Sequence, residues 1–160
     1  FMLRGINIKD LLLLNENNIK GDRIIYKRAK TGKLYSIKLE PEMLSILDEF
    51  DSTNTLLGVI PATDFQNADK LVSTIKFKTK SINTHLKKIG KELVVNEPIT
   101  TYVFRYSYAN TAKKLGYSKD LIAEALGHDY GNSVTGIYLE QFDLELVDNM
   151  NRSIISHINK

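Results

Sequence analysis

Six residues in this sequence are of types that could bind an anion and transfer protons. Arg4 and Arg105 each lie among large apolar residues, in FMLRGINI and TYVFRYSY. A buried guanidinium needs an anionic partner, which is either an internal carboxylate or a ligand. Tyr102 lies three residues before Arg105, and residues at this spacing share a helix face. The other three are Lys30 in AKTGK, His128 in EALGH and Tyr138 in VTGIYLEQF.

Each of these residues also has a structural explanation that involves no ligand. Arg4 could pair with Asp10, and Arg105 with a glutamate. A lysine in a hairpin connection is usually solvated, and a histidine after a helix-ending glycine often caps carbonyls. A tyrosine in a helix is most often part of the core. Taken one at a time, the six residues leave both explanations open.

The order of these residues along the chain carries more information than any one of them. An arginine comes first and a lysine follows in a predicted β-hairpin. A Tyr-x-x-Arg helix, a Leu-Gly-His sequence and a tyrosine come later. In this order the sequence resembles the catalytic domain of the tyrosine recombinases, the phage integrase family, and is most similar to integrases of Bacteroidetes-type mobile elements. The resemblance rests on LRG, KTGK, TTYVFRYSYAN, EALGH and VTGIYLEQF, and it spans residues 3 to about 142.

The resemblance implies site-specific DNA recombination or integration by transesterification. Tyr138 would be the nucleophile and would hold the DNA as a 3′-phosphotyrosyl ester. This ester stores the bond energy for rejoining, so neither ATP nor another cofactor is implied. Arg4 and Arg105 would fork onto the phosphate oxygens in place of a metal. Lys30 would be the general acid for the leaving 5′ oxygen, and His128 would bond the scissile phosphate.

The sequence departs from the family pattern beside both arginines. Tyr102 stands where a histidine is usual, so a base with a pKa of about 6.5 is missing and the proton acceptor is unassigned. A tyrosine there can still donate a hydrogen bond to phosphate. Asn7 replaces the acidic residue usual three places after Arg4, so Asp10 is the expected support of that arginine.

The patterning predicts a chain that is mainly α with a small antiparallel β-sheet, which is also the fold that the resemblance implies. The runs RIIYKR and LYSIKLE on either side of AKTGK predict a β-hairpin. PATDFQNADK is predicted to be a loop, and Ser133 to cap the segment that carries Tyr138. Other helices are predicted over residues 5–14 and to start near Pro41, Ser81, Thr101, Ser118 and Asp143.

The composition fits a globular protein that works inside the cell. Hydrophobic residues make up 42% of the chain and charged residues 26%. The net charge of +3 permits a nucleic-acid partner without demanding one. The chain has no cysteine, which excludes disulfides and cysteine-based zinc sites. No apolar run approaches the roughly 20 residues of a membrane helix, and we expect a cytoplasmic protein.

The resemblance also implies the partners of the chain. The substrate would be a double-stranded DNA recombination site, bound with an affinity that falls steeply with salt. Family members act as tetramers on such sites, although the isolated chain could be a monomer with its last helix packed in cis. We expect residues 1–160 to form the catalytic domain, without the N-terminal core-binding and arm-binding domains of the family. The residues expected to face DNA phosphates are Lys27, Arg28, Lys33, Lys76, Lys78, Lys80 and Lys87.

Three other functions are open. TAKKLGYSKDLIAEAL has helix-turn-helix spacing in Ala112, Gly116 and Ile122, so the chain could be a non-catalytic DNA-binding regulator. That function would leave Arg4 and the KTGK hairpin unexplained. A degenerate integrase would bind DNA without cutting it, and a helical domain could have no nucleic-acid role. A regulator would bind reversibly, whereas a recombinase would form a covalent adduct.

Overall fold

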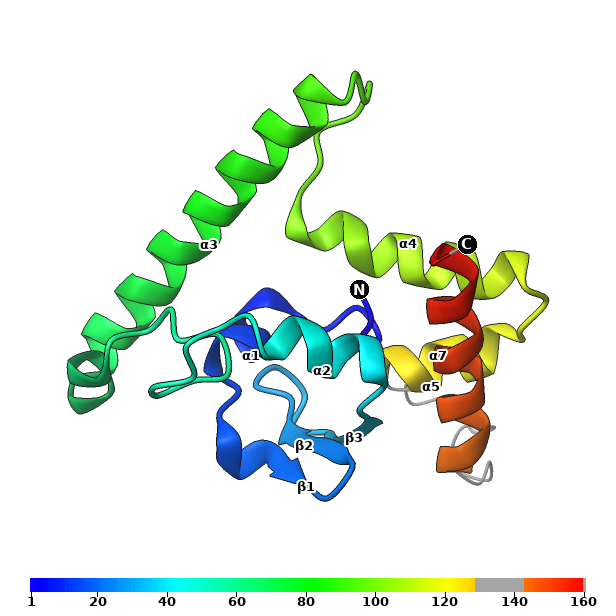
Figure 1. The fold of residues 1–160 in the computed structure, drawn as a ribbon, viewed down its shortest axis with the longest axis horizontal. Coiled ribbons are helices and arrows are strands. Elements are labelled where there is room, and N and C mark those ends of the chain that lie inside the picture. Colours follow the sequence, from blue (N-terminus) through cyan, green and yellow to red (C-terminus); the bar gives the residue numbers. More distant parts are fainter. Residues whose placement is uncertain (129–142, 160) are drawn as a thin grey trace.

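The computed structural model describes residues 1–128 and 143–159, which are mainly helical with one small sheet (Figure 1). The strands are β1 (Ile19–Lys20), β2 (Arg23–Lys27) and β3 (Leu34–Lys38), and they form an antiparallel sheet in the order β1-β2-β3. The helices are α1 (Ile8–Leu13), α2 (Pro41–Leu47), α3 (Ala68–Glu92), α4 (Thr101–Lys114), α5 (Lys119–Leu126) and α7 (Leu144–Ile158), and two short 3₁₀ helices cover Glu16–Asn18 and Ala62–Gln66. The predicted fold class is confirmed.

The β-hairpin packs one face of its two long strands into the core. Ile24, Tyr26, Tyr35 and Ile37 are buried, as period-two alternation requires. Tyr26 and Tyr35 are paired across the strands and their rings stack with centroids 5.0 Å apart. The same cluster includes residues of α2 and α7, so the hairpin is held firmly against the helices.

The last helix packs in cis. Asp143 caps it by accepting a hydrogen bond from the Glu145 N–H at 3.0 Å, as predicted. Its residues Val147, Met150 and Ile154 are buried in one cluster with residues of α4 and α5. Figure 1 shows α7 lying beside α4 and α5. The α7 helix therefore packs across α4 and α5 at one end of the molecule.

The long helix α3 begins much earlier than its sequence predicted. PATDFQNADK is not a loop, because Ala62–Gln66 is a 3₁₀ helix and α3 starts at Ala68. The Asn67 side chain caps α3 at the Lys70 N–H (3.0 Å), and buried Asp64 accepts a 2.6 Å bond from Thr74. Ser81 is thus inside the helix rather than its cap. These polar contacts stabilise a helical turn that lacks an apolar stripe.

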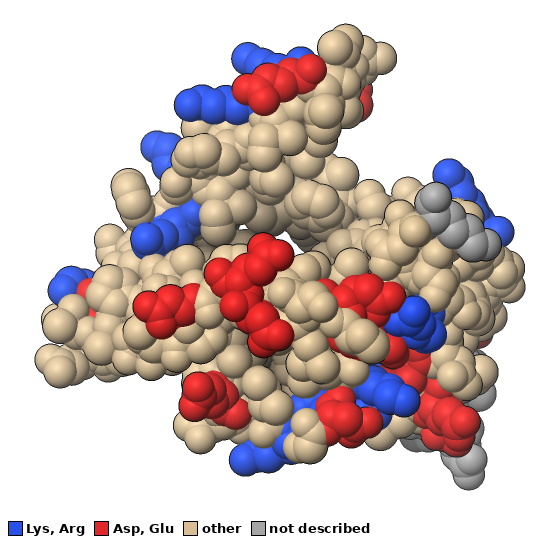
Figure 2. All heavy atoms as spheres, viewed as in Figure 1, with Lys and Arg blue, Asp and Glu red and all other residues tan. Residues whose placement is uncertain are grey.

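No helix in the two described ranges is long and apolar enough to cross a membrane. Charge is unevenly spread over the surface: Figure 2 shows basic side chains along α3 and acidic ones gathered near the middle of the same face.

Gly127, which ends α5, is expected to tolerate no side chain. It has φ +60°, and an added Cβ would overlap the ring and hydroxyl of buried Tyr35. Gly21 has the same φ with nothing within 4 Å of an added Cβ, so it provides a matched control. Gly21→Ala should cost about 1 kcal/mol for the left-handed backbone. Gly127→Ala should cost about 1–3 kcal/mol more, for overpacking, in urea unfolding. Equal losses in the two variants would contradict this contact.

Candidate functional site

Arg105 lies at the centre of the candidate site. It is on the inner face of α4 and only 9% exposed. Its guanidinium donates to the Gly5 carbonyl at 2.9 Å and, in a shorter bond, to the Leu126 carbonyl. Within the described ranges no carboxylate forms an ion pair with it. The internal salt bridge considered from the sequence is therefore absent from the described structure, where carbonyl dipoles are the main partners of the buried charge.

The backbone at Gly5 is shaped to meet Arg105. Arg4 and Gly5 both have positive φ, +52° and +60°. A Cβ on Gly5 would lie 2.8 Å from the Arg105 Cα, so only glycine allows this close approach. The LRG sequence thus supplies a carbonyl ligand to Arg105.

His128 lies directly beside the carbonyls that Arg105 and its neighbours bind. Ser118 caps α5 and Gly127 ends it, both as predicted, and the exposed His128 follows at the helix end. Arg28 donates to the Gly127 carbonyl at 3.1 Å, and the Tyr35 hydroxyl donates to the Leu126 carbonyl at 2.5 Å. Partial removal from water, and then the positive charges of Arg105 and Arg28, lower the pKa of His128. The imidazole is therefore biased toward its neutral form.

Arg4 has a different environment from the one its sequence predicted. It is 4% exposed and forms a 2.6 Å ion pair with Asp148 of α7, rather than with Asp10. Asp148 also pairs with Arg23 at 2.8 Å. The expectation of support from Asp10 was wrong, because that carboxylate accepts the Ala29 N–H at 3.1 Å and so anchors the hairpin connection.

Lys30 is exposed in the hairpin connection. It lines a hollow of about 150 Å³ together with Asn7, Lys9, Asp10, Arg28 and Ala29. The hydrogen bond from the neighbouring Ala29 N–H to Asp10 fixes the backbone next to Lys30. Lys30 itself forms no hydrogen bond with Arg105.

Tyr102 lies apart from the Arg105 guanidinium. It is 55% exposed, whereas Arg105 is buried, and its ring packs edge-on against Tyr106 with centroids 4.8 Å apart. Tyr138, the predicted nucleophile, and its predicted cap Ser133 lie outside the described residues. The structure therefore brings Arg105, His128 and Arg28 together and directs the guanidinium of Arg4 toward α7.

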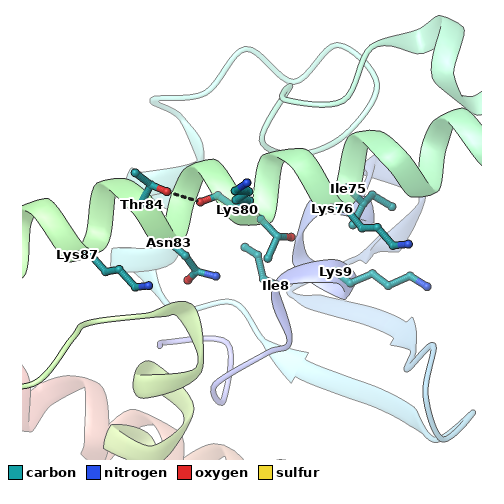
Figure 3. Close-up of a pocket in the computed structure, with 9 residues that line it drawn as sticks. Ile8, Lys9, Ile75, Lys76, Lys80, Asn83, Thr84 and Lys87 are labelled. Carbon is teal, nitrogen blue, oxygen red and sulfur yellow. Dashed lines mark hydrogen bonds between the residues drawn. The ribbon is translucent and has the colours of Figure 1, made fainter.

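Three of the six predicted phosphate-facing lysines line one groove, and the other three do not. Lys76, Lys80 and Lys87 of α3, with Lys9 of α1, line a groove of about 620 Å³ (Figure 3). Lys33 instead pairs with Glu124 of α5 at 2.8 Å. Lys27 is exposed on β2 and Lys78 is half-buried on α3. Among the described residues, no group of three His, Cys, Asp or Glu side chains could hold a metal ion.

Comparison with known proteins identifies the fold. No protein-family model matches the sequence. No curated protein matches it either. The structure does match the crystal structure of XerA recombinase with a TM-score of 0.52 at 17% sequence identity. The chain has the fold of a tyrosine recombinase. The match covers 98% of this chain and 54% of the XerA recombinase chain, so this chain spans about half the length of that protein.

Sequence reasoning missed two residues of this recombinase fold, Arg23 and Asp148. The signal for Asp148 is a carboxylate next to Val147 in the apolar stripe of the last helix, where a buried charge needs a partner. Arg23 opens the first hairpin strand, and its Nε also donates to Ser36 at 2.6 Å. Neither residue has a local sequence motif.

Asp148 is expected to contribute strongly to stability, because it is the shared partner of two arginines. Asp148→Asn would leave the buried Arg4 without a carboxylate, and breaking such a pair costs about 3 kcal/mol. Chemical denaturation with the exposed Asp69→Asn as control would measure this loss. A difference between the two variants below about 1 kcal/mol would show that the arginines do not depend on Asp148.

Proposed function

We propose that the chain is the catalytic domain of a site-specific DNA recombinase of the tyrosine type. The observation that carries the proposal is the buried Arg105, which pairs with no carboxylate among residues 1–128 and 143–159 and lies beside Arg28 and His128. A cationic cluster without a carboxylate among the described residues is suited to an anionic ligand, and a phosphodiester provides oxygens for a guanidinium fork. The recombinase fold supports DNA as the source of that phosphate.

The proposed reaction is a reversible transesterification. The phenol oxygen of Tyr138 attacks the scissile phosphorus and gives its proton to solvent water, and the bond from phosphorus to the 5′ oxygen breaks. Lys30 gives a proton to that leaving oxygen, and the DNA stays attached as a 3′-phosphotyrosyl ester. Arg105 and His128 stabilise the charge on the non-bridging oxygens. Attack by a new 5′ hydroxyl reverses each step: that hydroxyl returns its proton to Lys30, and the departing phenolate of Tyr138 takes a proton back from water.

Several finer parts of the proposal rest on the sequence motifs. We propose that the protein also carries N-terminal DNA-binding domains and that four copies assemble on paired sites. The motif likeness to integrases of Bacteroidetes-type mobile elements makes integration of such an element the proposed role, and this would take place in the cytoplasm. Tyr102 and the α3 lysines would contact the DNA backbone around the cleaved phosphate.

A regulator that reads DNA with α5 is less well supported. A recognition helix must present a free face to the major groove. Here the hairpin packs against the C-terminal end of α5, through the bonds of Lys33 to Glu124 and of Tyr35 and Arg28 to the last carbonyls. This packing fits a helix that positions the residues around Arg105 better than it fits a recognition helix that enters the major groove.

The proposed function is tested by trapping the covalent intermediate. The full-length protein is incubated, in the presence of a chelator, with a nicked duplex of the element end. After cleavage the short fragment that carries the new 5′ hydroxyl dissociates, so the covalent intermediate cannot be rejoined. A recombinase should give a protein–DNA band that survives denaturing electrophoresis and disappears after protease treatment. A purely reversible complex, dissociated by denaturant, would support the regulator or the degenerate integrase instead.

A further inference from the structure

We propose that Arg28 is a second phosphate ligand of the cluster around Arg105, at the place for which sequence order predicts Arg4. The inference rests on the proposed function, because it names the residue that shares the substrate phosphate with Arg105. It starts from the contacts that Arg28 and Arg105 make at the end of α5.

The two guanidinium groups bind consecutive carbonyls. Arg105 reaches Leu126 from α4, and Arg28 reaches Gly127 from the hairpin, 99 residues away in the sequence. The Tyr35 hydroxyl donates a hydrogen bond to the same Leu126 carbonyl, and both arginines are close enough to influence its pKa. Burial raises the pKa of Tyr35, and the charges of Arg28 and Arg105 oppose that rise. Both cations therefore lie close to one point beside His128.

The backbone of Arg28 is fixed, although the residue follows the end of β2. Its N–H donates to the Lys33 carbonyl at 2.9 Å, and its own carbonyl accepts the Gly32 N–H at 2.8 Å. The side chain is half-buried, and within residues 1–128 and 143–159 its partners are the Gly127 carbonyl and the nearby Tyr35 hydroxyl, which leaves N–H donors of its guanidinium for a ligand. A phosphate between Arg28 and Arg105 would bond to donors that are already oriented.

The other arginines are less available. In the described part of the chain, Arg4, Arg23 and Arg152 each pair with a carboxylate, whereas Arg28 and Arg105 do not. Arg4 would have to leave Asp148 and expose itself before it could bind DNA. Asp10 lies in the hollow on the other side of Arg28, but its carboxylate is used by the Ala29 N–H. The assignment makes Arg4 a positioning residue that holds Gly5 against Arg105.

The first arm of the test measures phosphate binding without cleavage. Inorganic phosphate is titrated into the protein while the Nε–H resonance of Arg105 is followed by NMR. The wild type should show a saturable shift, and Arg28→Ala should weaken phosphate binding about tenfold or more, since a charge-assisted bond is lost. Arg28→Lys should fall between the two, because it keeps the charge but not the fork. Lys38→Ala, an exposed change of the same charge on β3, should match the wild type.

The second arm measures the rate of covalent adduct formation by the same variants. If Arg28→Ala, with a native amide spectrum, forms adduct and binds phosphate like the wild type, the inference is overturned while the proposed function stands. If no protein forms adduct but phosphate binding still depends on Arg28, the inference stands and the function fails. Should the alanine variant unfold, Arg28→Lys decides the outcome: phosphate affinity equal to wild type would overturn the inference.

Discussion

Replacing Tyr138 by phenylalanine is expected to abolish the covalent protein–DNA adduct. The change removes only the phenol oxygen, which is the atom that would bond to phosphorus, and a phenyl ring offers no substitute nucleophile. DNA binding should persist, because the cationic cluster and the α3 groove are untouched. Adduct formation is measured with the nicked duplex, and binding with the same duplex by fluorescence anisotropy.

The matched control for Tyr138→Phe is Tyr117→Phe, which removes the same atom from a residue at the edge of the core formed by α4, α5 and α7. The control should form adduct at the wild-type rate. An adduct that persists in Tyr138→Phe would mean that another residue is the nucleophile, and the assignment of this tyrosine would then be wrong.

Replacing Arg105 by alanine is expected to slow adduct formation about 10³-fold, as for loss of a preorganised donor to a charged transition state. Arg105→Lys should recover only part of the rate, because an ammonium cannot bind two phosphate oxygens in a fork. Single-turnover rates at saturating protein separate this loss from weaker DNA binding.

The control for Arg105 is Arg152→Ala, which removes the same charge from a 44% exposed side chain paired with Glu42 at 2.6 Å. It should leave the rate unchanged. Since Arg105 also ties the Gly5 and Leu126 carbonyls together, each variant needs a thermal unfolding curve. A folded Arg105→Ala protein that cleaves at the wild-type rate would contradict the proposed site.

Much of the fold could be predicted from local sequence, because local physical chemistry determines it. The hairpin follows from alternation, and α5 from the Ser118 cap and the left-handed Gly127. The start of α3 could not be predicted in the same way. Its first turns are stabilised by the buried Asp64, which lies before the helix in a segment with the composition of a loop.

For the candidate site, the sequence offers residue types but not their geometry. Arg105, Lys30 and His128 have recognisable neighbours, yet no local pattern shows that Arg4 pairs with Asp148, 144 residues further along the chain. The same holds for Arg28, because its contact is the carbonyl of Gly127, 99 residues further along the chain. Tyr102 shares helical spacing with Arg105, but its position in the first turn of α4 leaves it on the surface.

The most direct test of the proposed site is a crystal structure of the full-length protein bound to a duplex of the element end. We expect the scissile phosphate within hydrogen-bond distance of the Arg105 guanidinium and the His128 imidazole. A complex in which Arg105 still contacts only the Gly5 and Leu126 carbonyls, with every phosphate beyond its reach, would contradict the account.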